Sequence, residues 1–268
     1  MHRLQVSTPG GTDQIVDIRF KGQKIDLLVG INKIEGLSYV REEDGIVKIG
    51  SLTNLNILQK SEIISKKFPS VVDATIKFAS FQIRNRATIG GNICHSTPSA
   101  DMAPPLLTLD ASAKTISSKR ERTVKLNGFF TDPGTNILGG GEIMKELSIS
   151  IPPVHSRNAY LRHCSREALD IAIASVAAYL EIDASNTIRE VRIALGAVAT
   201  TPMRSHSAKA MINGREASVE NFVEAGKLAS REAKPISDVR SSAEYRRRVT
   251  SVLTKRALSL ALDRCKWA

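Results

Sequence analysis

The spacing of apolar and polar positions predicts a first half built from short strands and helices in mixed order. Apolar and polar residues alternate over 45–51 between bounding glycines, which is typical of a half-buried strand. Helical periodicity over 55–67 ends just before Pro69, because a proline disfavours helix in the residue that precedes it. The same reasoning predicts further strands at 25–29, 112–117, 123–126 and 147–151, and further helices at 71–81 and 104–111.

The double proline Pro152-Pro153 is followed by a different pattern and predicts a domain boundary. After it, the periodicity predicts long strands at 158–164, 172–182 and 188–199, then helices at 205–212, 219–230 and 242–263. Strands followed by helices indicate an α+β unit, with helices on one face of a small antiparallel sheet. We therefore expect a first domain at 1–153 and a second domain at 154–268.

Composition and charge narrow the possible classes of protein. The 268 residues are 42% hydrophobic, which is enough to bury a sizeable core and excludes wholesale disorder. The 38 basic and 27 acidic residues give a net charge of +11, and the basic surplus gathers over 227–268. Such a balance favours a nucleic acid, an acidic membrane surface or an acidic protein as partner, or a helix with a solvated basic face. An aromatic content of 4% weakens the interpretation as a single-strand binder, which needs stacking platforms.

Cysteine usage and hydropathy predict a cytoplasmic protein. The cysteines Cys94, Cys164 and Cys265 are odd in number and far apart, which indicates a reducing compartment. We expect no membrane span, because no apolar run approaches ~18 residues. We also expect no secretory signal, since the first residues lack an apolar segment.

Two glycine pairs are the strongest candidates for a binding site. They lie in the segments 9–13 (PGGTD) and 87–92 (ATIGGN). Adjacent glycines allow backbone N–H groups to converge on an anion, and the neighbouring threonine and asparagine side chains add donors. Two such loops could hold a diphosphate between them, although each pair alone is more typical of a plain turn. Neither loop fits the Rossmann or Walker A pattern.

Other candidates each have a structural alternative. Asp101 is either a helix-capping acid or an acceptor for a ribose or polyol hydroxyl. We expect Cys94 to be buried filler rather than a redox thiol, and His95 to be either a phosphate contact or a surface side chain. The glycine run 139–141 is most simply a flexible turn. No catalytic triad, carboxylate pair or metal-ligand spacing is evident, so we predict no catalytic and no metal-binding side chain.

The stretch from Gln82 to Asp101 resembles the flavin-binding subunit of the molybdenum hydroxylases, the family of xanthine dehydrogenase and carbon monoxide dehydrogenase. That family carries a Gly-Gly-Thr-Asp loop, then Ile-Arg-Asn and Thr-Ile-Gly-Gly-Asn, and then an Ala-Asp segment. Further matches follow in the same order at 109–111, 166–172, 193–198, 202–204 and 237–246, so that the resemblance spans nearly the whole chain. It departs at the start, where only nine residues precede Gly10 and Ser7-Thr8-Pro9 replaces an apolar strand end.

The resemblance implies both a fold and a set of cofactor contacts. The fold is α+β, with a two-subdomain FAD-binding domain (a PCMH/vanillyl-alcohol-oxidase-like clamp, here with a shortened N-terminal strand and helix), followed by a small C-terminal domain of antiparallel sheet and helices. Arg162 stands where the family usually has lysine, and Asp170 and Arg166 lie near the flavin edge or form an ion pair. The implied FAD contacts are Gly10, Gly11, Thr12, Asp13, Phe78, Thr88, Ile89, Gly90, Gly91, Asn92, Asp101, Ile143 or Met144, and Arg162.

The function implied by the resemblance is electron transfer. The chain would receive electrons from [2Fe–2S] clusters of a small subunit, fed by a large molybdopterin subunit, and pass them through FAD to an external acceptor. The implied assembly is a dimer of heterotrimers without nucleic acid. Three alternatives stay open: a stand-alone flavoprotein oxidoreductase, a basic nucleic-acid-binding protein, and a scaffold that has lost its flavin. The substrate cannot be read here, because in this family its pocket lies on another chain.

Overall fold

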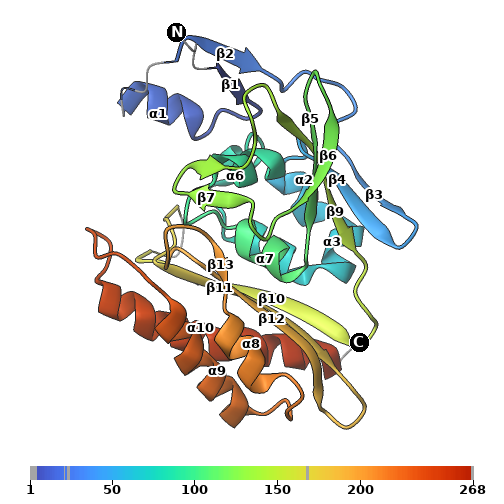
Figure 1. Ribbon diagram of the computed structural model, residues 1–268, viewed down its shortest axis with the longest axis vertical. Coiled ribbons are helices and arrows are strands. Elements are labelled where there is room, and N and C mark those ends of the chain that lie inside the picture. The colour runs from blue at the N-terminus through green and yellow to red at the C-terminus, as the bar shows by residue number, and fades with distance from the viewer. Residues whose placement is uncertain (1–4, 21, 23–24, 167–168, 267–268) are drawn as a thin grey trace.

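The computed structural model describes residues 5–20, 22, 25–166 and 169–266. Two domains stack along its long axis (Figure 1). The N-terminal domain contains β1 to β9 and its helices, and the C-terminal domain contains β10 to α10. Each domain has its own cluster of buried apolar side chains. The α+β fold with two antiparallel main sheets confirms the predicted class.

The chain begins with a small lobe in which β1 (Gln5–Thr8) and β2 (Leu27–Gly30) pair in parallel. Helix α1 (Gln14–Phe20) connects them. The sequence pattern missed β1 and α1, although the predicted strand at 25–29 overlaps β2. A strand therefore leads directly into the first glycine loop, which the sequence analysis did not expect.

A five-stranded antiparallel sheet with the order β3-β4-β9-β5-β6 forms the body of the N-terminal domain. Its strands are β3 (Val40–Glu43), β4 (Ile46–Gly50), β9 (Ile143–Ser150), β5 (Ser112–Ile116) and β6 (Glu121–Lys125). A small hairpin of β7 (Phe130–Asp132) and β8 (Thr135–Asn136) follows β6 along the chain. The predicted strand regions of this sheet are confirmed, whereas β3 and the small hairpin were not predicted.

Short helices pack on this sheet, and two of the predicted helices are broken. The segment 55–67 forms α2 (Leu55–Lys60) and α3 (Glu62–Lys67), because Ser61 has extended backbone and its side chain caps α3. The segment 71–81 forms α4 (Pro69–Ile76) and then α5 (Phe81–Arg84), which Ser80 caps. Helix α6 (Ile89–His95) begins inside the second glycine loop, and α7 (Ala103–Thr108) follows.

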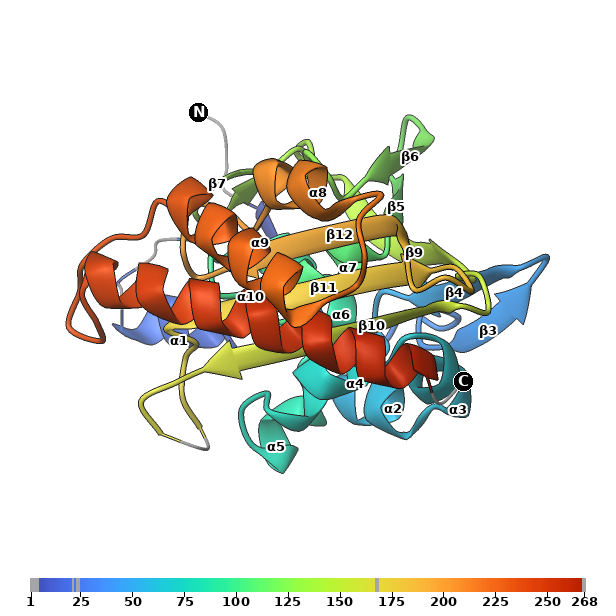
Figure 2. The same cartoon turned by 90° about the horizontal axis from the view of Figure 1, so that it is seen from below.

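The C-terminal domain is a four-stranded antiparallel sheet with helices on its outer face (Figure 2). The strands run in the order β10 (Ser156–His163), β11 (Ala174–Ile182), β12 (Ile188–Gly196) and β13 (Met203–Arg204). Helices α8 (His206–Ile212) and α9 (Val219–Glu232) precede the long α10 (Ala243–Lys266), which lies across β10 and β11. The predicted strands, hairpin and helices are all present.

The inner face of this second sheet packs against helices α4 and α7 of the N-terminal domain. Because side chains alternate along a strand, β11 contributes to both cores. Val176 and Ala178 belong to the C-terminal core, whereas Ala177 and Tyr179 belong to the N-terminal core. The two domains therefore share one sheet as their common wall.

Three aspartates of the N-terminal domain also bind arginines of the C-terminal domain. Asp73 accepts two hydrogen bonds of 2.8 Å from Arg264. The other two pairings are Asp101 with Arg162 at 2.8 Å, and Asp110 with both Arg204 and Arg192. These ion pairs hold the domains together around the shared sheet. No helix among the described residues is long and apolar enough to cross a membrane.

Candidate cofactor site

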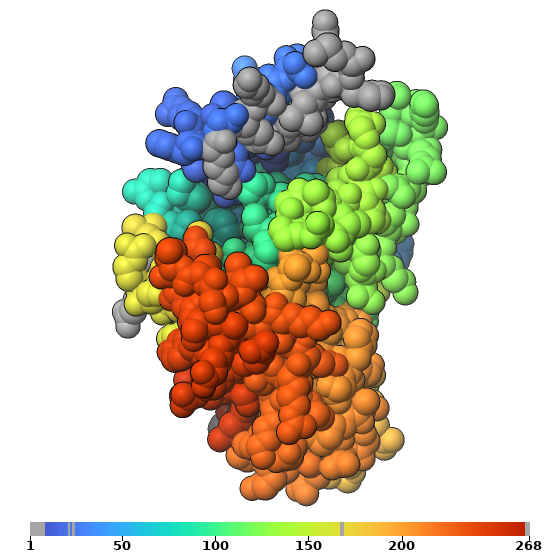
Figure 3. Space-filling model, turned by 60° about the vertical axis from the view of Figure 1, so that its left-hand side comes forward, coloured from blue at the N-terminus to red at the C-terminus, as the bar shows by residue number. Residues whose placement is uncertain are grey.

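A cavity of about 650 Å³ lies where the N-terminal lobe, helix α6 and the start of β9 meet. Its volume falls within the range of known ligand pockets, ~300–1,000 Å³. Figure 3 shows the lobe (blue) above the region of α6 (blue-green), with the C-terminal helices (orange and red) below. All but three of the site residues expected from the sequence line this cavity. Those that line it are Gly10, Gly11, Thr12, Asp13, Phe78, Thr88, Gly90, Gly91, Asn92, Ile143 and Met144.

The first glycine loop lies directly on the chain that leads into the second. A Cβ atom at Gly10 would lie 2.1 Å from the carbonyl oxygen of Arg86, so only glycine fits there. Gly11 has a φ of +72°, in the left-handed region that favours glycine. The loop then enters α1, whose first turn is closed by hydrogen bonds from the N–H of Ile15 to the carbonyl of Gly11 at 3.1 Å and from the N–H of Asp17 to the carbonyl of Asp13 at 2.9 Å. Thr12 and Asp13, just before this turn, line the cavity.

The second glycine loop forms the start of α6 and is docked against the end of β4. The N–H of Gly90 donates to the carbonyl of Ser51 at 3.0 Å, and that of Gly91 donates to Thr88 Oγ1 at 3.0 Å. A Cβ atom at Gly90 would lie 2.6 Å from Ser51 Cβ. From the sequence, both loops are expected to offer backbone N–H groups to an anion. That expectation is wrong for Gly90 and Gly91, whose N–H groups are used inside the fold.

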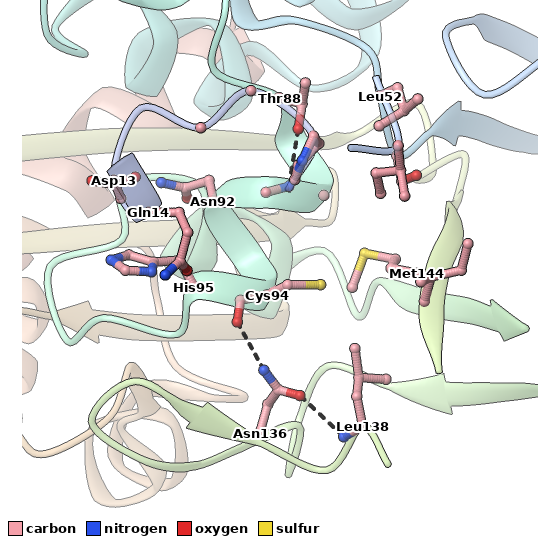
Figure 4. Close-up of a pocket in the computed structure, with 18 of the residues that line it drawn as sticks. Asp13, Gln14, Leu52, Thr88, Asn92, Cys94, His95, Asn136, Leu138 and Met144 are labelled. Atoms are coloured by element: carbon pink, nitrogen blue, oxygen red, sulfur yellow. Dashed lines mark hydrogen bonds between the residues drawn. The ribbon is translucent and has the colours of Figure 1, made fainter. Parts of the chain in front are cut away.

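Side-chain donors remain on this wall of the cavity (Figure 4). The Asn92 carbonyl oxygen accepts from the N–H of Met102 at 3.2 Å, so its amide NH₂ is the end available to a ligand. Ser51 Oγ is buried and has no hydrogen-bond partner among the described residues. Thr88 accepts from Gly91 and keeps its hydroxyl proton as a donor. These groups can bind phosphate or sugar oxygens.

The opposite wall is the segment 136–142, which the sequence analysis interpreted as a flexible turn at its glycines. The structure has a turn at these glycines, with the N–H of Glu142 donating to the carbonyl of Gly139 at 3.0 Å, and it adds that Asn136, Leu138 and the glycine run 139–141 all line the cavity. Asn136 donates to the carbonyl of Cys94 at 2.8 Å and fixes one end of the segment to α6 (Figure 4). The neighbouring Glu142 fixes the other end. No sequence motif marked this wall.

Cys94 and His95 lie at the end of α6 and both line the cavity. Burial raises the pKa of the Cys94 thiol to about 12, so it stays protonated and packs against the core, as expected of filler. Of the described residues around the cavity, His95 alone has a basic side chain. His95 is therefore the side chain best suited to meet a negative charge here.

Three of the expected contacts lie outside the cavity lining: Ile89, Asp101 and Arg162. Ile89 is fully buried in the core. Asp101 is also buried and accepts hydrogen bonds from Tyr160 at 2.5 Å and from Arg162 at 2.8 Å. Burial raises the pKa of Asp101 even though Arg162 opposes the shift. Both Asp101 oxygens are thus engaged by the C-terminal domain, which differs from the expected role of Asp101 as a free acceptor.

The described residues of the segment that joins β10 to β11 do not line the cavity either. Arg166 and Asp170 form an ion pair at 3.8 Å in which Arg166 is largely exposed. This arrangement fits the alternative in which the two residues form an ion pair rather than lie near the flavin edge. Residues 167 and 168 of the matched stretch 166–172 lie outside the described residues.

Comparisons with known proteins agree with this geometry. A family model described as the FAD binding domain in molybdopterin dehydrogenase matches residues 7–153. A second, the carbon monoxide dehydrogenase flavoprotein C-terminal domain, matches residues 159–261. The putative xanthine dehydrogenase FAD-binding subunit of Escherichia coli is 32% identical over 257 residues, which cover 94% of this chain and 87% of the relative.

Carbon monoxide dehydrogenase gives a match in both sequence and structure. Its medium chain from Hydrogenophaga pseudoflava is 30% identical over 256 residues, covering 96% of this chain and 88% of that one. A solved structure of the enzyme from the same organism, lacking the Mo-pyranopterin moiety of its cofactor, superposes with a TM-score of 0.94. That match has 30% identity and covers 97% of this chain and 90% of the other.

The chain belongs to the family of FAD-binding subunits of molybdopterin dehydrogenases. Proteins of this class are subunits of oxidoreductase complexes, and their cofactor is FAD. The residues of the cavity fit that cofactor. The loops that approach each other at Gly10 and Gly91, the orphaned Ser51 hydroxyl and the apolar Met144 offer polar and apolar walls to one extended dinucleotide.

Proposed function

We propose that this chain transfers electrons from the [2Fe–2S] clusters of a partner subunit, through FAD, to an external acceptor. The observation that carries the proposal is the cavity between two glycine loops in a chain of this family. FAD supplies the redox chemistry when it is bound, because its flavin can accept and release electrons one or two at a time. The chain binds and orients the cofactor.

We assign the diphosphate of FAD to the space between the first turn of α1 and the Thr88–Asn92 wall. Thr12 and Asn92 supply donors there, and His95 supplies the basic side chain. Phe78 and Met144 both line the cavity and offer apolar surface to the rings. Asp101 and Arg162 form a buried ion pair between the domains, and Met102, the residue after Asp101, donates its N–H to the Asn92 side chain of the cavity.

The partners belong to the same proposal. We assign to the complex a large molybdopterin-binding subunit and a small [2Fe–2S] subunit, arranged as a dimer of heterotrimers in the cytoplasm. Solved and curated relatives carry the names of carbon monoxide, xanthine and glyceraldehyde dehydrogenase subunits, which supports a multi-subunit enzyme. The exposed arginines of α10, among them Arg247 and Arg248, fit an acidic partner surface.

The test is an anaerobic reduction of the assembled complex. The chain is co-expressed with the proposed large molybdopterin-binding subunit and small [2Fe–2S] subunit, and the purified complex is mixed with the substrate of its molybdenum subunit. We expect the iron–sulfur and flavin absorbance to bleach together, and the flavin signal to stay oxidised when the small subunit is omitted. Flavin reduction without the small subunit contradicts the electron route and supports a stand-alone flavoprotein. Absence of any bound flavin contradicts the whole proposal.

A further inference from the structure

The segment 136–142, here called the strap, is held at both ends and lies over the cavity between them. At its first end, Asn136 donates to the carbonyl of Cys94 at 2.8 Å and to Ser96 Oγ at 3.0 Å. The side-chain oxygen Oδ1 of Asn136 accepts from the N–H of Leu138 at 3.0 Å (Figure 4). The strap is thereby tied to the helix that carries the second glycine loop.

At the second end, the Glu142 carboxylate joins the strap to the main sheet. It accepts two hydrogen bonds of 2.7 Å from Arg122 on β6 and one of 2.6 Å from Thr115 on β5. The same carboxylate accepts from the N–H of Gly139 at 2.9 Å, and Arg122 also donates to the carbonyl of Ile137 at 3.0 Å. These hydrogen bonds, led by Arg122, lower the pKa of Glu142 to about 2, so it is ionised at neutral pH.

Two of the three strap glycines, Gly139 and Gly140, have no reason within the described residues to be glycine, whereas Gly141 has a φ of +75°, which favours glycine. A Cβ atom at Gly140 would meet no described atom within 4 Å, and at Gly139 the nearest is 3.8 Å away on Glu142. Neither has a φ in the left-handed region. Both nevertheless line the cavity, which indicates that the strap backbone must come close to something placed inside it.

We propose that Glu142, held by Arg122, is a positioning residue that fixes the strap so that its backbone at Gly139 and Gly140 lies against the bound FAD. The inference rests on the proposed location of the cofactor. A bidentate guanidinium–carboxylate pair is directional, so it holds the strap in one place before the ligand arrives. A wall that is already ordered reduces the entropy cost of binding.

The test is an equilibrium titration of the full chain with FAD for the wild type, Glu142→Gln, Gly140→Ala and a control, Glu121→Gln. Glu121 precedes Arg122 on β6 and pairs at the surface with Lys114 and Lys145. We expect E142Q to raise the Kd for FAD about tenfold through loss of the ordered wall. We expect G140A to raise it at least about threefold by crowding the cofactor, and E121Q to leave it within about twofold.

The unfolding midpoint of the FAD-free protein separates positioning from folding. The added methyl of G140A meets no described atom within 4 Å, so that midpoint should stay unchanged or rise while binding weakens. If G140A binds FAD like the wild type, or E142Q lowers the midpoint and leaves the Kd unchanged, the inference is overturned. A wild type that binds no FAD contradicts the proposed function itself, so the two failures are distinguishable.

Discussion

At the scale of single residues, Gly10 is the position where the site least tolerates an added side chain. Its missing Cβ lets the first loop rest on the backbone of Arg86. We expect Gly10→Ala to push the loops apart, to destabilise the fold by about 1–3 kcal/mol and to weaken FAD binding at least about tenfold. Urea unfolding measures the first effect, and titration with FAD measures the second.

Gly30→Ala is the matched control, because it lies at the end of β2 and its Cβ would be in ordinary contact at 3.4 Å from Asn32. We expect G30A to bind FAD within about twofold of the wild type, as is usual for surface substitutions away from special features. Equal losses of affinity in G10A and G30A would show that the close approach of the loops does not matter.

The positions of the glycine pairs could be predicted from the sequence, but the reason for them could not. Gly90 was interpreted as a donor of backbone N–H, whereas it is glycine because Ser51 packs against it. Likewise, the basic surplus over 227–268 was interpreted as a partner-binding or solvated face, yet Arg246 within it is almost fully buried. Such roles depend on which segment of a distant element lies opposite, and one sequence does not record that.

At the scale of elements, the start of helix α10 is fixed by the ion pair of Arg246 with Asp238 at 2.7 Å. Burial raises the pKa of Asp238, but hydrogen bonds from Arg240 N–H and from Arg246 outweigh it and lower the value to about 2. Asp238 is therefore ionised, and Arg246 also donates to the carbonyls of Ile173 and Ala197. The helix is thus locked to the strands beneath it.

We expect Asp238→Asn to cost about 2 kcal/mol at pH 7, because it leaves a buried guanidinium without its counter-charge. The folded-state pKa is below the ordinary value of 3.8, so the contribution is complete above that pH. It is lost as the pH falls from about 3.8 to about 2. In urea unfolding between pH 2 and 7, the free energy of unfolding of D238N should therefore fall less steeply toward acid pH than that of the wild type. Asp263→Asn, an exposed change on the same helix, should follow the wild type. Parallel wild-type and D238N curves would refute this account.

Element positions were predictable wherever periodicity dominated, as in β11 and β12. Boundaries were lost where a side chain redirected the backbone. Ser61 splits a run that is helical by pattern, because its hydroxyl caps the next helix. The strap was missed for a different reason: its anchors, Asn136 and Glu142, bind partners on separate elements and leave no local signal.

At the scale of the whole molecule, the shared sheet makes the two domains depend on each other. Adjacent residues of β11 fill different cores, and aspartates of one domain bind arginines of the other. These arginines use part of the chain's basic surplus inside the fold, although the exposed arginines of α10 remain available to a partner. The division into two domains at residue 153 remains a prediction. We do not expect the parts of the chain on either side of it to unfold independently.

We therefore expect the full chain to unfold in one calorimetric transition. Asp110→Asn removes a carboxylate that pairs with both Arg192 and Arg204. It should lower the midpoint by a few degrees, corresponding to ~1 kcal/mol, without splitting the peak. Glu62→Gln, which removes an exposed pair with Lys66 within α3, should change the midpoint little. Two separate transitions in the wild type would contradict the interdependence of the domains.

The cavity between the two glycine loops is the proposed location of FAD, on which the other assignments depend. Titration of the purified full chain with FAD, followed by the quenching of flavin fluorescence and by bound flavin after gel filtration, tests it most directly. We expect saturation at about one FAD per chain, as for a single preformed pocket, and a loss of affinity in G10A that G30A does not share. Absence of saturable binding, or saturation that G10A leaves unchanged, would contradict it.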